Sequence, residues 1–300
     1  MSRFDLEPEG FDYQGNLMRP PSEHDSILIQ ATVGCSHNKC AFCNAYRDKR
    51  PFIIKPQETI LRDLAFASKY CRRQSRVFLM DGDALIIPQK RLVWTLEQIR
   101  EKLPWVTRVG LYANGKSIRA KSDADLRELA SLGLGIAYLG VESGDDVTLK
   151  RICKGSTSEQ LIREGRRLED AGIAASVTVL LGIGGRERSL IHARETGRVL
   201  TAMDPSYVGA LSVLVMPHTP LAEQQARGEF VMPSPHELML ELREMVAHTD
   251  LTHGLFRSNH ASNYLPLKIT YPEGKAAALR TIDAAINGEI ALKPEWYRAL

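Results

Sequence analysis

The sequence predicts an α/β fold, a partial (βα)6 TIM-like barrel with a C-terminal mostly helical extension. Between residues 26 and 215, short uncharged runs rich in β-branched residues alternate with stretches in which apolar residues recur at helical spacing. Such an alternation builds a parallel sheet from βαβ units with right-handed crossovers. Six units over about 190 residues are too few for the complete eight-stranded barrel, which takes about 250 residues. We therefore expect an incomplete barrel with an open mouth.

Six strands are expected, each an apolar run bounded by turn residues. They cover residues 26–33, 76–80, 106–112, 135–141, 174–181 and 207–215. Five helices are expected between them, with Pro56 in the first turn of the first helix, Ser122 capping the third and Gly172 ending the fourth. These helices cover about residues 56–68, 89–102, 122–132, 158–171 and 189–203.

Two further segments flank the barrel core of residues 26–215. Residues 1–25 carry Gly and Pro among polar residues, which predicts an irregular N-terminal arm. Residues 216–300 lose the strand–helix rhythm, and helices are expected there only over 237–248 and 274–287. Residues 256–273, rich in Asn, Ser and His, are expected to be irregular. We expect this extension to cover the barrel mouth.

Composition and charge narrow the class of protein. With 44% hydrophobic and 25% charged residues in 300, the chain resembles a globular protein with an ample core. A net charge of +3 favours neither a nucleic-acid polymer nor a membrane surface as partner, although a local basic patch would still allow nucleic acid. The first ten residues lack the apolar segment of a signal peptide, and no run is long enough to span a bilayer. We expect a cytoplasmic protein.

Three of the five cysteines, Cys35, Cys40 and Cys43, fall within nine residues. Thiolates gather in this way when they share a metal ion that prefers sulfur. Three thiolates are one fewer than the four that complete a structural zinc or iron–sulfur site. An odd number of cysteines also excludes a complete set of internal disulfides, so the cluster indicates metal or redox chemistry.

A simpler interpretation of these cysteines is a structural zinc knuckle with His37 as fourth ligand. His37 lies only two residues after Cys35, which leaves little room to close a tetrahedron. The two other cysteines, Cys71 and Cys153, are expected to be structural, because cysteine is among the most buried residue types.

Polar residues follow successive predicted strands at the point where each strand ends. Because the carboxyl ends of parallel strands meet at one edge, we expect these groups on the same rim as the cysteine loop, where ligands collect. They are Asp81-Gly82-Asp83, Asn114, Glu142-Ser143 and Gly182–Gly185.

Three cysteines on the loop after the first strand of a (βα)6 barrel resemble the radical S-adenosylmethionine (radical SAM) superfamily. The usual spacing there is C-x3-C-x2-C, whereas this chain has C-x4-C-x2-C, with one extra residue between Cys35 and Cys40. The resemblance extends over about residues 26–215. It implies a [4Fe–4S] cluster held by the three cysteines, with one iron left for S-adenosylmethionine (SAM). It further implies reductive cleavage of SAM to a 5′-deoxyadenosyl radical that abstracts hydrogen from a substrate.

The resemblance also implies roles for residues at the strand ends. Phe42 occupies the aromatic position beside the adenine, and Val179–Gly185 resembles the segment that packs on it. Asp81-Gly82-Asp83 stands where the family commonly has Gly-Gly-Glu, whose carbonyls and acid hold the SAM amine. The remaining positions implied to contact SAM are Asn114 and Glu142 for the ribose hydroxyls, and Ser143 with Lys154 or Arg163 for the carboxylate.

Several of these positions have a simpler structural interpretation. Asp81 and Asp83 would serve equally well to end a strand and cap a helix. Lys154 and Arg163 fit solvated helix-face charges. The glycines from Gly182 suffice as a turn, and no Lys-Ser/Thr follows them as in a phosphate-binding loop.

The polar segment around His260 and Asn263 is expected to fold over the barrel mouth and contact substrate, with a plain surface loop as the alternative. The strand pattern resembles the branch with the Elongator-like, methylthiotransferase and oxygen-independent coproporphyrinogen oxidase enzymes. No added basic RNA-binding or cobalamin-binding domain is visible, which favours a small-molecule or peptide substrate over RNA. The resemblance implies an electron donor such as a flavodoxin or ferredoxin. A non-catalytic, zinc-stapled binding protein is the alternative outside the enzyme class.

Overall fold

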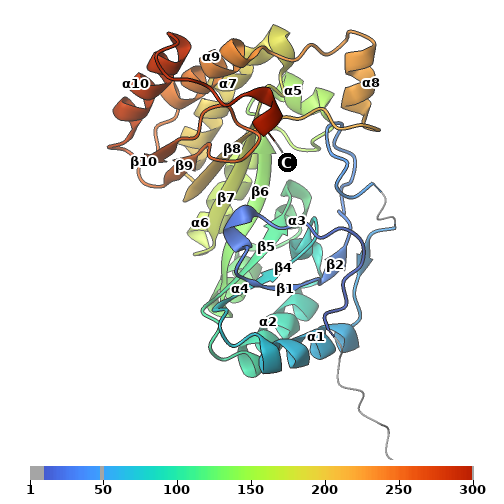
Figure 1. Cartoon of the computed structure of the whole chain (residues 1–300). Helices are drawn as coiled ribbons and strands as arrows, with labels where there is room; N and C mark the ends of the chain where they lie inside the picture. The colour runs from blue at the N-terminus through green and yellow to red at the C-terminus, as the bar shows by residue number, and fades with distance from the viewer. Residues whose placement is uncertain (1–9, 48–50, 299–300) are drawn as a thin grey trace, which may run out of the picture. The chain divides into compact units, whose positions relative to one another are not determined.

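The computed structural model describes residues 10–47 and 51–298 (Figure 1). The chain divides into two compact units, each of which is described by itself. The first holds the described residues of Met1–Asn38, Ala45–Ala137 and Ala171–Ile173. The second holds those of Lys39–Asn44, Tyr138–Asp170 and Ala174–Leu300.

The described strands form one eight-stranded sheet in the order β1-β4-β5-β6-β7-β8-β9-β10. Their bounds are β1 Ile27–Ile29, β4 Arg76–Leu79, β5 Arg108–Ala113, β6 Leu134–Glu142, β7 Ala174–Leu181, β8 Tyr207–Ser212, β9 Leu255–Arg257 and β10 Lys268–Thr270. Strand β1 pairs with β4, β4 with β5, β7 with β8 and β8 with β9 in parallel, whereas β10 runs antiparallel to β9. The mostly parallel α/β fold predicted from the sequence is confirmed.

In the first unit, β1, β4 and β5 place fully buried aliphatic side chains in register. Ile29 pairs with Leu79, which pairs with Leu111, and all three are 0% exposed. Strands buried in this way carry few polar residues, which is why their sequences are continuous apolar runs. The helices of this unit are α1 Gln57–Tyr70, α2 Gln89–Lys102, α3 Gly115–Arg119 and α4 Asp123–Ser131.

The second unit contains β7 to β10 and the C-terminal part of β6. Its helices are α5 Asp146–Arg151, α6 Ser158–Asp170, α7 Gly185–Met203, α8 Pro220–Ala226, α9 Pro235–Ala247 and α10 Lys275–Ile286. Helix α9 packs against both α7 and α10 (Figure 1). Its register is fixed at the N-terminus by a capping box, in which Ser234 and Glu237 bond each other's backbone nitrogen.

Several boundaries differ from the expectation. Residues 256–273 are not wholly irregular, because β9 pairs with β8 and β10 with β9, burying Phe256 and Ile269 completely. Strands of three residues are too short to show a period in sequence. The range expected to form the first strand contains two strands, β1 and the short β2 (Thr32–Val33). Strand β2 pairs with β3 (Ile53–Ile54). The short helices α3, α5 and α8 were not expected.

Other boundaries are close. The helix expected from residue 189 begins at Gly185, immediately after the glycine turn, and the strand expected to reach residue 215 ends at Ser212. The division into arm, core and extension stays a prediction. Within the described residues, every helix is too short or too polar to cross a membrane.

Candidate functional site

The three clustered cysteines are divided between the units. Cys35 lies in the first unit, and Cys40 and Cys43 lie in the second. All three are partly exposed, and none of them forms a disulfide. Among the described residues, no three His, Cys, Asp or Glu side chains are grouped in a way that could hold a metal ion. The assignment of these thiols as ligands therefore depends on their spacing and chemistry.

The other two cysteines differ from each other. Cys71 is half-buried after α1, and burial raises the pKa of its thiol. Cys153 is exposed and has a positive φ of 55°. Burial therefore explains the presence of Cys71 better than that of Cys153.

In the first unit, the backbone after β4 lies directly against Cys35. The nitrogen of Gly82 donates to the carbonyl of Gly34 at 3.0 Å. A Cβ built on Gly82 would lie 2.6 Å from the Cβ of Cys35 and 2.9 Å from the ring of Tyr46. Only glycine allows this approach, so the predicted neighbourhood of Gly82 and the cysteine loop is present.

Asp81, just before this glycine, is fully buried and has a φ of 70°. Its Oδ2 accepts hydrogen bonds from the nitrogen of Gly34 and from Nε2 of Gln30, both at 3.0 Å. The Asp81 side chain thus binds the residue that precedes Cys35.

Asp83 and Asn114 form a second buried polar group in this unit. Asp83 Oδ2 accepts from the hydroxyl of Ser36 and from Nδ2 of Asn114, the latter at 2.7 Å. Asn114 Oδ1 also caps α3 by accepting from the nitrogen of Ser117 at 3.0 Å. Burial raises the pKa of Asp83 to about 6, although these hydrogen bonds oppose the rise. Both side chains therefore hold the residue after Cys35 and the start of α3.

In the second unit, Glu142 and Lys154 form a nearly buried ion pair. The Lys154 Nζ and Glu142 Oε1 atoms are 3.0 Å apart, with side chains 10% and 11% exposed. A Cβ on Gly140 would lie 2.1 Å from Glu142 Oε1, so the pair packs directly on the β6 backbone. Glu142 itself has a positive φ of 63°, which turns the chain at the end of β6. The structure thus brings two predicted site residues together.

Ser143 belongs to a fully buried network that the sequence did not predict. Its Oγ accepts from the nitrogen of Asp145 at 3.0 Å and lies 2.7 Å from Nδ1 of His192 in α7. Nε2 of His192 lies 3.4 Å from Oε1 of Glu241 in α9. Glu241 Oε1 also accepts from the nitrogen of Gly182, at 2.6 Å, and Oε2 accepts from the hydroxyl of Ser189. The network joins the ends of β6 and β7 through two helices.

One sequence signal could have indicated this network. Glu241 stands among Leu238, Leu242 and Met245 on the apolar face of its helix. A carboxylate on such a face is rarely buried without a partner, so it points to a buried donor set.

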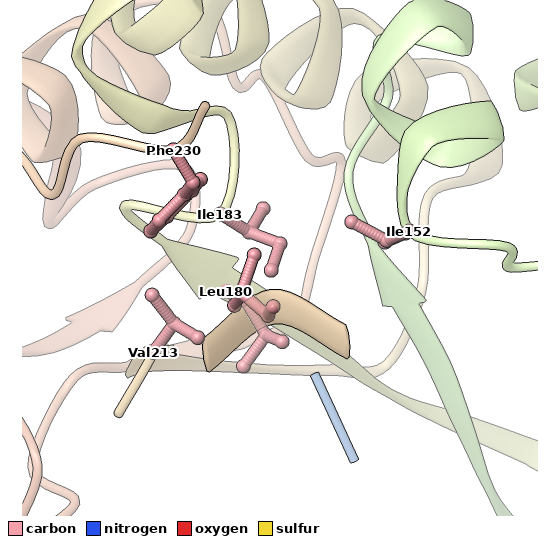
Figure 2. Close-up of a cluster of buried hydrophobic side chains, with 6 residues drawn as sticks. Ile152, Leu180, Ile183, Val213 and Phe230 are labelled. Atoms are coloured by element: carbon pink, nitrogen blue, oxygen red, sulfur yellow. The ribbon is translucent and has the colours of Figure 1, made fainter. Parts of the chain in front are cut away.

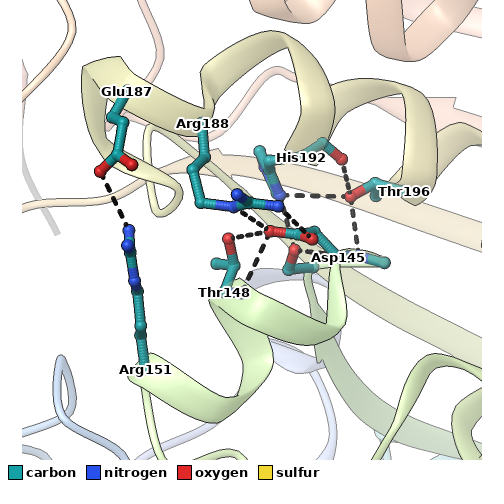
Figure 3. A network of polar contacts seen from close by, with 9 residues as sticks. Asp145, Thr148, Arg151, Glu187, Arg188, His192 and Thr196 are labelled. Carbon is teal, nitrogen blue, oxygen red and sulfur yellow. Dashed lines mark hydrogen bonds and ion pairs between the residues drawn. The ribbon is translucent and has the colours of Figure 1, made fainter.

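Asp145 caps α5 and binds Arg188 with both carboxylate oxygens. Arg188 Nε and Nη2 donate at 2.8 and 2.9 Å, and the hydroxyl and nitrogen of Thr148 donate as well (Figure 3). Burial raises the pKa of Asp145, but the hydrogen bonds outweigh it and hold the pKa at about 2. The start of α5 is thereby fixed to α7.

Phe42 packs on an apolar cluster of the second unit. The cluster consists of Ile152, Leu180, Ile183, Val213, Leu221 and Phe230 (Figure 2). The neighbouring Ala41 donates to the carbonyl of Ile152 at 2.9 Å and accepts from the nitrogen of Leu221 at 3.0 Å. The half of the cysteine loop that carries Cys40 and Cys43 is thus anchored to this unit by backbone bonds and by an aromatic ring.

The remaining predicted residues lie elsewhere. Arg163 is exposed within α6. Asn263 is 2% exposed, and its amide donates to the carbonyls of Ala210 and Ser258 and accepts from Ser212. His260 is partly buried, with Nδ1 2.9 Å from the hydroxyl of Ser262, and burial lowers its pKa.

A protein-family model described as the radical SAM superfamily matches residues 29–194, more than half of the 300-residue chain. Among curated proteins, 4′-phospho-dehydrooxetanocin synthase of Priestia megaterium is 23% identical over 201 residues, which are 60% of this chain and 27% of that protein.

Solved structures show the same fold. The crystal structure of methylornithine synthase (PylB) matches with a TM-score of 0.51 at 17% identity, over 75% of this chain and 63% of that one. The radical SAM methyltransferase TsrM of Kitasatospora setae, solved with cobalamin and a [4Fe–4S] cluster, matches with a TM-score of 0.54 at 17% identity. This match covers 66% of this chain and 39% of that one. The chain therefore spans less than two thirds of each of these relatives. The family match, over more than half of its length, shows that this chain belongs to the radical SAM superfamily.

Proposed function

We propose that this chain is an enzyme that uses a [4Fe–4S] cluster and SAM, the cofactors of its superfamily, with Cys35, Cys40 and Cys43 as the cluster ligands. The observation that carries the proposal is the match of the radical SAM family model to residues 29–194, a range that includes these three partly exposed cysteines on one short loop. Three thiolates suit an iron–sulfur cluster with one open iron. The close approach of Gly82 to Cys35 supports it, because it leaves strand-end backbone beside the first ligand.

When bound, the two cofactors supply the reductive cleavage of SAM to a 5′-deoxyadenosyl radical, which removes hydrogen from the substrate. The protein's residues bind and orient. In this proposal the carbonyls of Asp81 and Gly82, with Asp83, accept from the SAM amine. Phe42 lies beside the adenine, held there by the apolar cluster on which it packs.

The other positions complete the proposed SAM site. Asn114 and Glu142 bind ribose hydroxyls, and Ser143 with Lys154 or Arg163 binds the carboxylate. The ion pair between Lys154 and Glu142 supports a joint role for these two, since each fixes the orientation of the other. Ser143 and Asn114 already bond within the protein, so each would contact SAM through a remaining lone pair or N–H.

The substrate we propose is a small molecule or peptide, contacted in part by His260 and Asn263. A flavodoxin or ferredoxin would supply the electron. The odd number of cysteines and the clustering of three of them favour a cytoplasmic location. RNA modification is the alternative within the enzyme class.

Anaerobic reconstitution with iron and sulfide tests the proposal. The protein is expected to turn brown, bleach with dithionite and release 5′-deoxyadenosine from SAM. Replacing Cys35, Cys40 or Cys43 by Ala should abolish all three, whereas Cys71→Ala should abolish none. A colourless protein that carries one zinc ion would instead support the zinc-stapled binding protein.

The same assay also searches for the substrate. Run with a fractionated cell extract and followed by mass spectrometry, it should show one metabolite consumed in proportion to deoxyadenosine released. If RNA fractions alone stimulate release, the RNA-modifying alternative is correct.

A further inference from the structure

Asp81 holds a backbone conformation that favours glycine. Its φ is 70°, in the left-handed region that L-residues with a Cβ adopt at a cost in free energy. Asp81 is also 0% exposed, so its carboxylate gains no compensation from water. A residue that is strained and desolvated in this way persists only when its side chain makes bonds that offset both costs.

The bonds that Asp81 makes converge on Gly34, the residue before Cys35. Oδ2 of Asp81 accepts from the nitrogen of Gly34, and the nitrogen of the next residue, Gly82, donates to the carbonyl of Gly34, each at 3.0 Å. Both backbone groups of Gly34 are thus held by consecutive residues of one turn. These two groups belong to the peptide units on either side of the Gly34 Cα, so neither unit rotates freely and the position of the Cys35 Cα is restrained.

The second bond of Asp81 requires an acceptor at this place. Gln30 Oε1 accepts from the nitrogen of Gln14 at 2.8 Å, and Gln30 Nε2 donates to the carbonyl of Gln14 at 3.0 Å. These two bonds set the orientation of the Gln30 amide, so its NH2 group is the one that faces Asp81, at 3.0 Å. Both donors reach the same oxygen, Oδ2, and a charged carboxylate oxygen accepts such hydrogen bonds more strongly than a neutral amide oxygen would.

We propose that Asp81 is a positioning residue whose carboxylate, through Gly34, places the Cys35 thiolate for the iron–sulfur cluster. This inference rests on the proposed function. It accounts for an aspartate at a left-handed position where glycine would fold without strain. It also gives the N-terminal arm around Gln14 a part in the site, because the arm orients Gln30.

Asp81→Gly removes the carboxylate and keeps the backbone conformation, so it tests the effect of the carboxylate alone. Glycine adopts a φ of 70° without strain, which offsets part of the cost of leaving the donors of Gly34 and Gln30 without their acceptor, so the variant should remain folded, as thermal unfolding can check. Asp204→Gly is the matched control: Asp204 has a φ of 52°, caps α7, and binds Thr252 through its carboxylate. Asp81→Asn keeps the size of the side chain and one acceptor oxygen but removes the negative charge.

The first readout is the cluster itself. After reconstitution, iron release to a chelator is expected to be about tenfold faster in Asp81→Gly, the factor carried by one hydrogen bond to a charged group. The electron paramagnetic resonance spectrum of the reduced cluster should shift as well. Asp81→Asn should fall between, and Asp204→Gly should match the wild type. Wild-type release rates and spectra in a folded Asp81→Gly would overturn the proposal.

The second readout uses the metal-free protein and separates this proposal from the proposed function. Alkylation of Cys35 by iodoacetamide, followed by peptide mass spectrometry, should be faster in Asp81→Gly, whereas alkylation of Cys71 should not change. If the wild type binds no cluster, the proposed function fails, and this arm still decides whether Asp81 fixes Cys35. Equal rates of Cys35 alkylation in the wild type and in Asp81→Gly would refute the proposal that Asp81 fixes Cys35.

Discussion

The carboxylate of Glu241, in α9, accepts a hydrogen bond of 2.6 Å from the backbone nitrogen of Gly182, at the end of β7. The two residues are 59 positions apart. The same side chain accepts from Ser189 and lies 3.4 Å from His192, whose other nitrogen reaches Ser143 at the end of β6. Helix α9 lies beyond the residues that the family model matches. Through Glu241 it thus fixes the turn after β7 and, by way of His192, the end of the neighbouring strand β6.

Replacing Glu241 by Ala should destabilise the second unit strongly. The change leaves the nitrogen of Gly182 and the hydroxyl of Ser189 buried without their acceptor, and it removes the carboxylate that lies 3.4 Å from Nε2 of His192. The expected loss is about 3 kcal/mol, measured by urea unfolding. Glu244→Ala, on the same helix but at an ion pair with the half-exposed Arg194, is the control and should cost less than about 1 kcal/mol. Equal losses for the two variants would contradict a special role for Glu241.

The Asp145–Arg188 pair should make stability depend on acid pH. The pKa of Asp145 is about 2 in the folded protein and about 3.9 when unfolded, so its stabilisation is complete above pH 4. It is lost as the pH falls from about 4 to about 2, by about 2 kcal/mol in total. Urea midpoints of wild type and Asp145→Asn should converge over this window. A variant of the exposed Asp250 is the control, and its urea midpoint should depend on pH as that of the wild type does.

Gly82→Ala should prevent cluster binding. The new methyl group would lie 2.6 Å from the Cβ and 3.0 Å from the Cα of Cys35, and a backbone atom cannot move aside as a flexible side chain can. Iron content after reconstitution should fall at least about tenfold, because misplacing one ligand costs at least that factor in metal affinity. Gly209→Ala is the control in a strand, where the nearest atom would be 3.8 Å away. A fully loaded Gly82→Ala protein would show that the loop adapts.

Replacing His260 and Asn263 one at a time should have different effects on stability and on turnover of the substrate. Asn263→Ala removes three hydrogen bonds from a buried position and should lower stability by about 2 to 3 kcal/mol. His260→Ala should leave stability and SAM cleavage intact and impair turnover of the substrate. Thermal unfolding and a product assay distinguish these results. Unchanged turnover in a folded His260→Ala protein would remove His260 from the substrate site.

The elements that the sequence predicts best are those with a long, uninterrupted period. Helix α2 and strand β7 have the predicted bounds, because their apolar residues recur regularly and prolines or glycines flank them. Strands β9 and β10, with three residues each, contain too few side chains to show alternation. Their pairing depends on the edge that β8 offers, which local sequence does not contain.

The candidate site follows the same division. Positions such as Gly82 and Glu142 could be located, because a polar residue after an apolar run marks a strand end. The partners of these residues could not. The contact of Asp81 with Gly34 spans 47 residues, and that of Ser143 with His192 spans 49. Such contacts depend on strand register and helix packing, which are set by the whole unit.

The grip on Gly34 also orders events during synthesis of the chain. Gly34 is held by residues 81 and 82, and β1 obtains its partner only when β4 pairs with it. A nascent chain that ends before these residues carries all three clustered cysteines without the turn that fixes the first of them. Iron and sulfide that arrive earlier would meet loose thiols. In the proposed enzyme, cluster assembly on these cysteines would therefore follow the folding of the first strand–helix–strand unit, and a translation pause before residue 82 would prolong the interval in which the cysteines lack that turn.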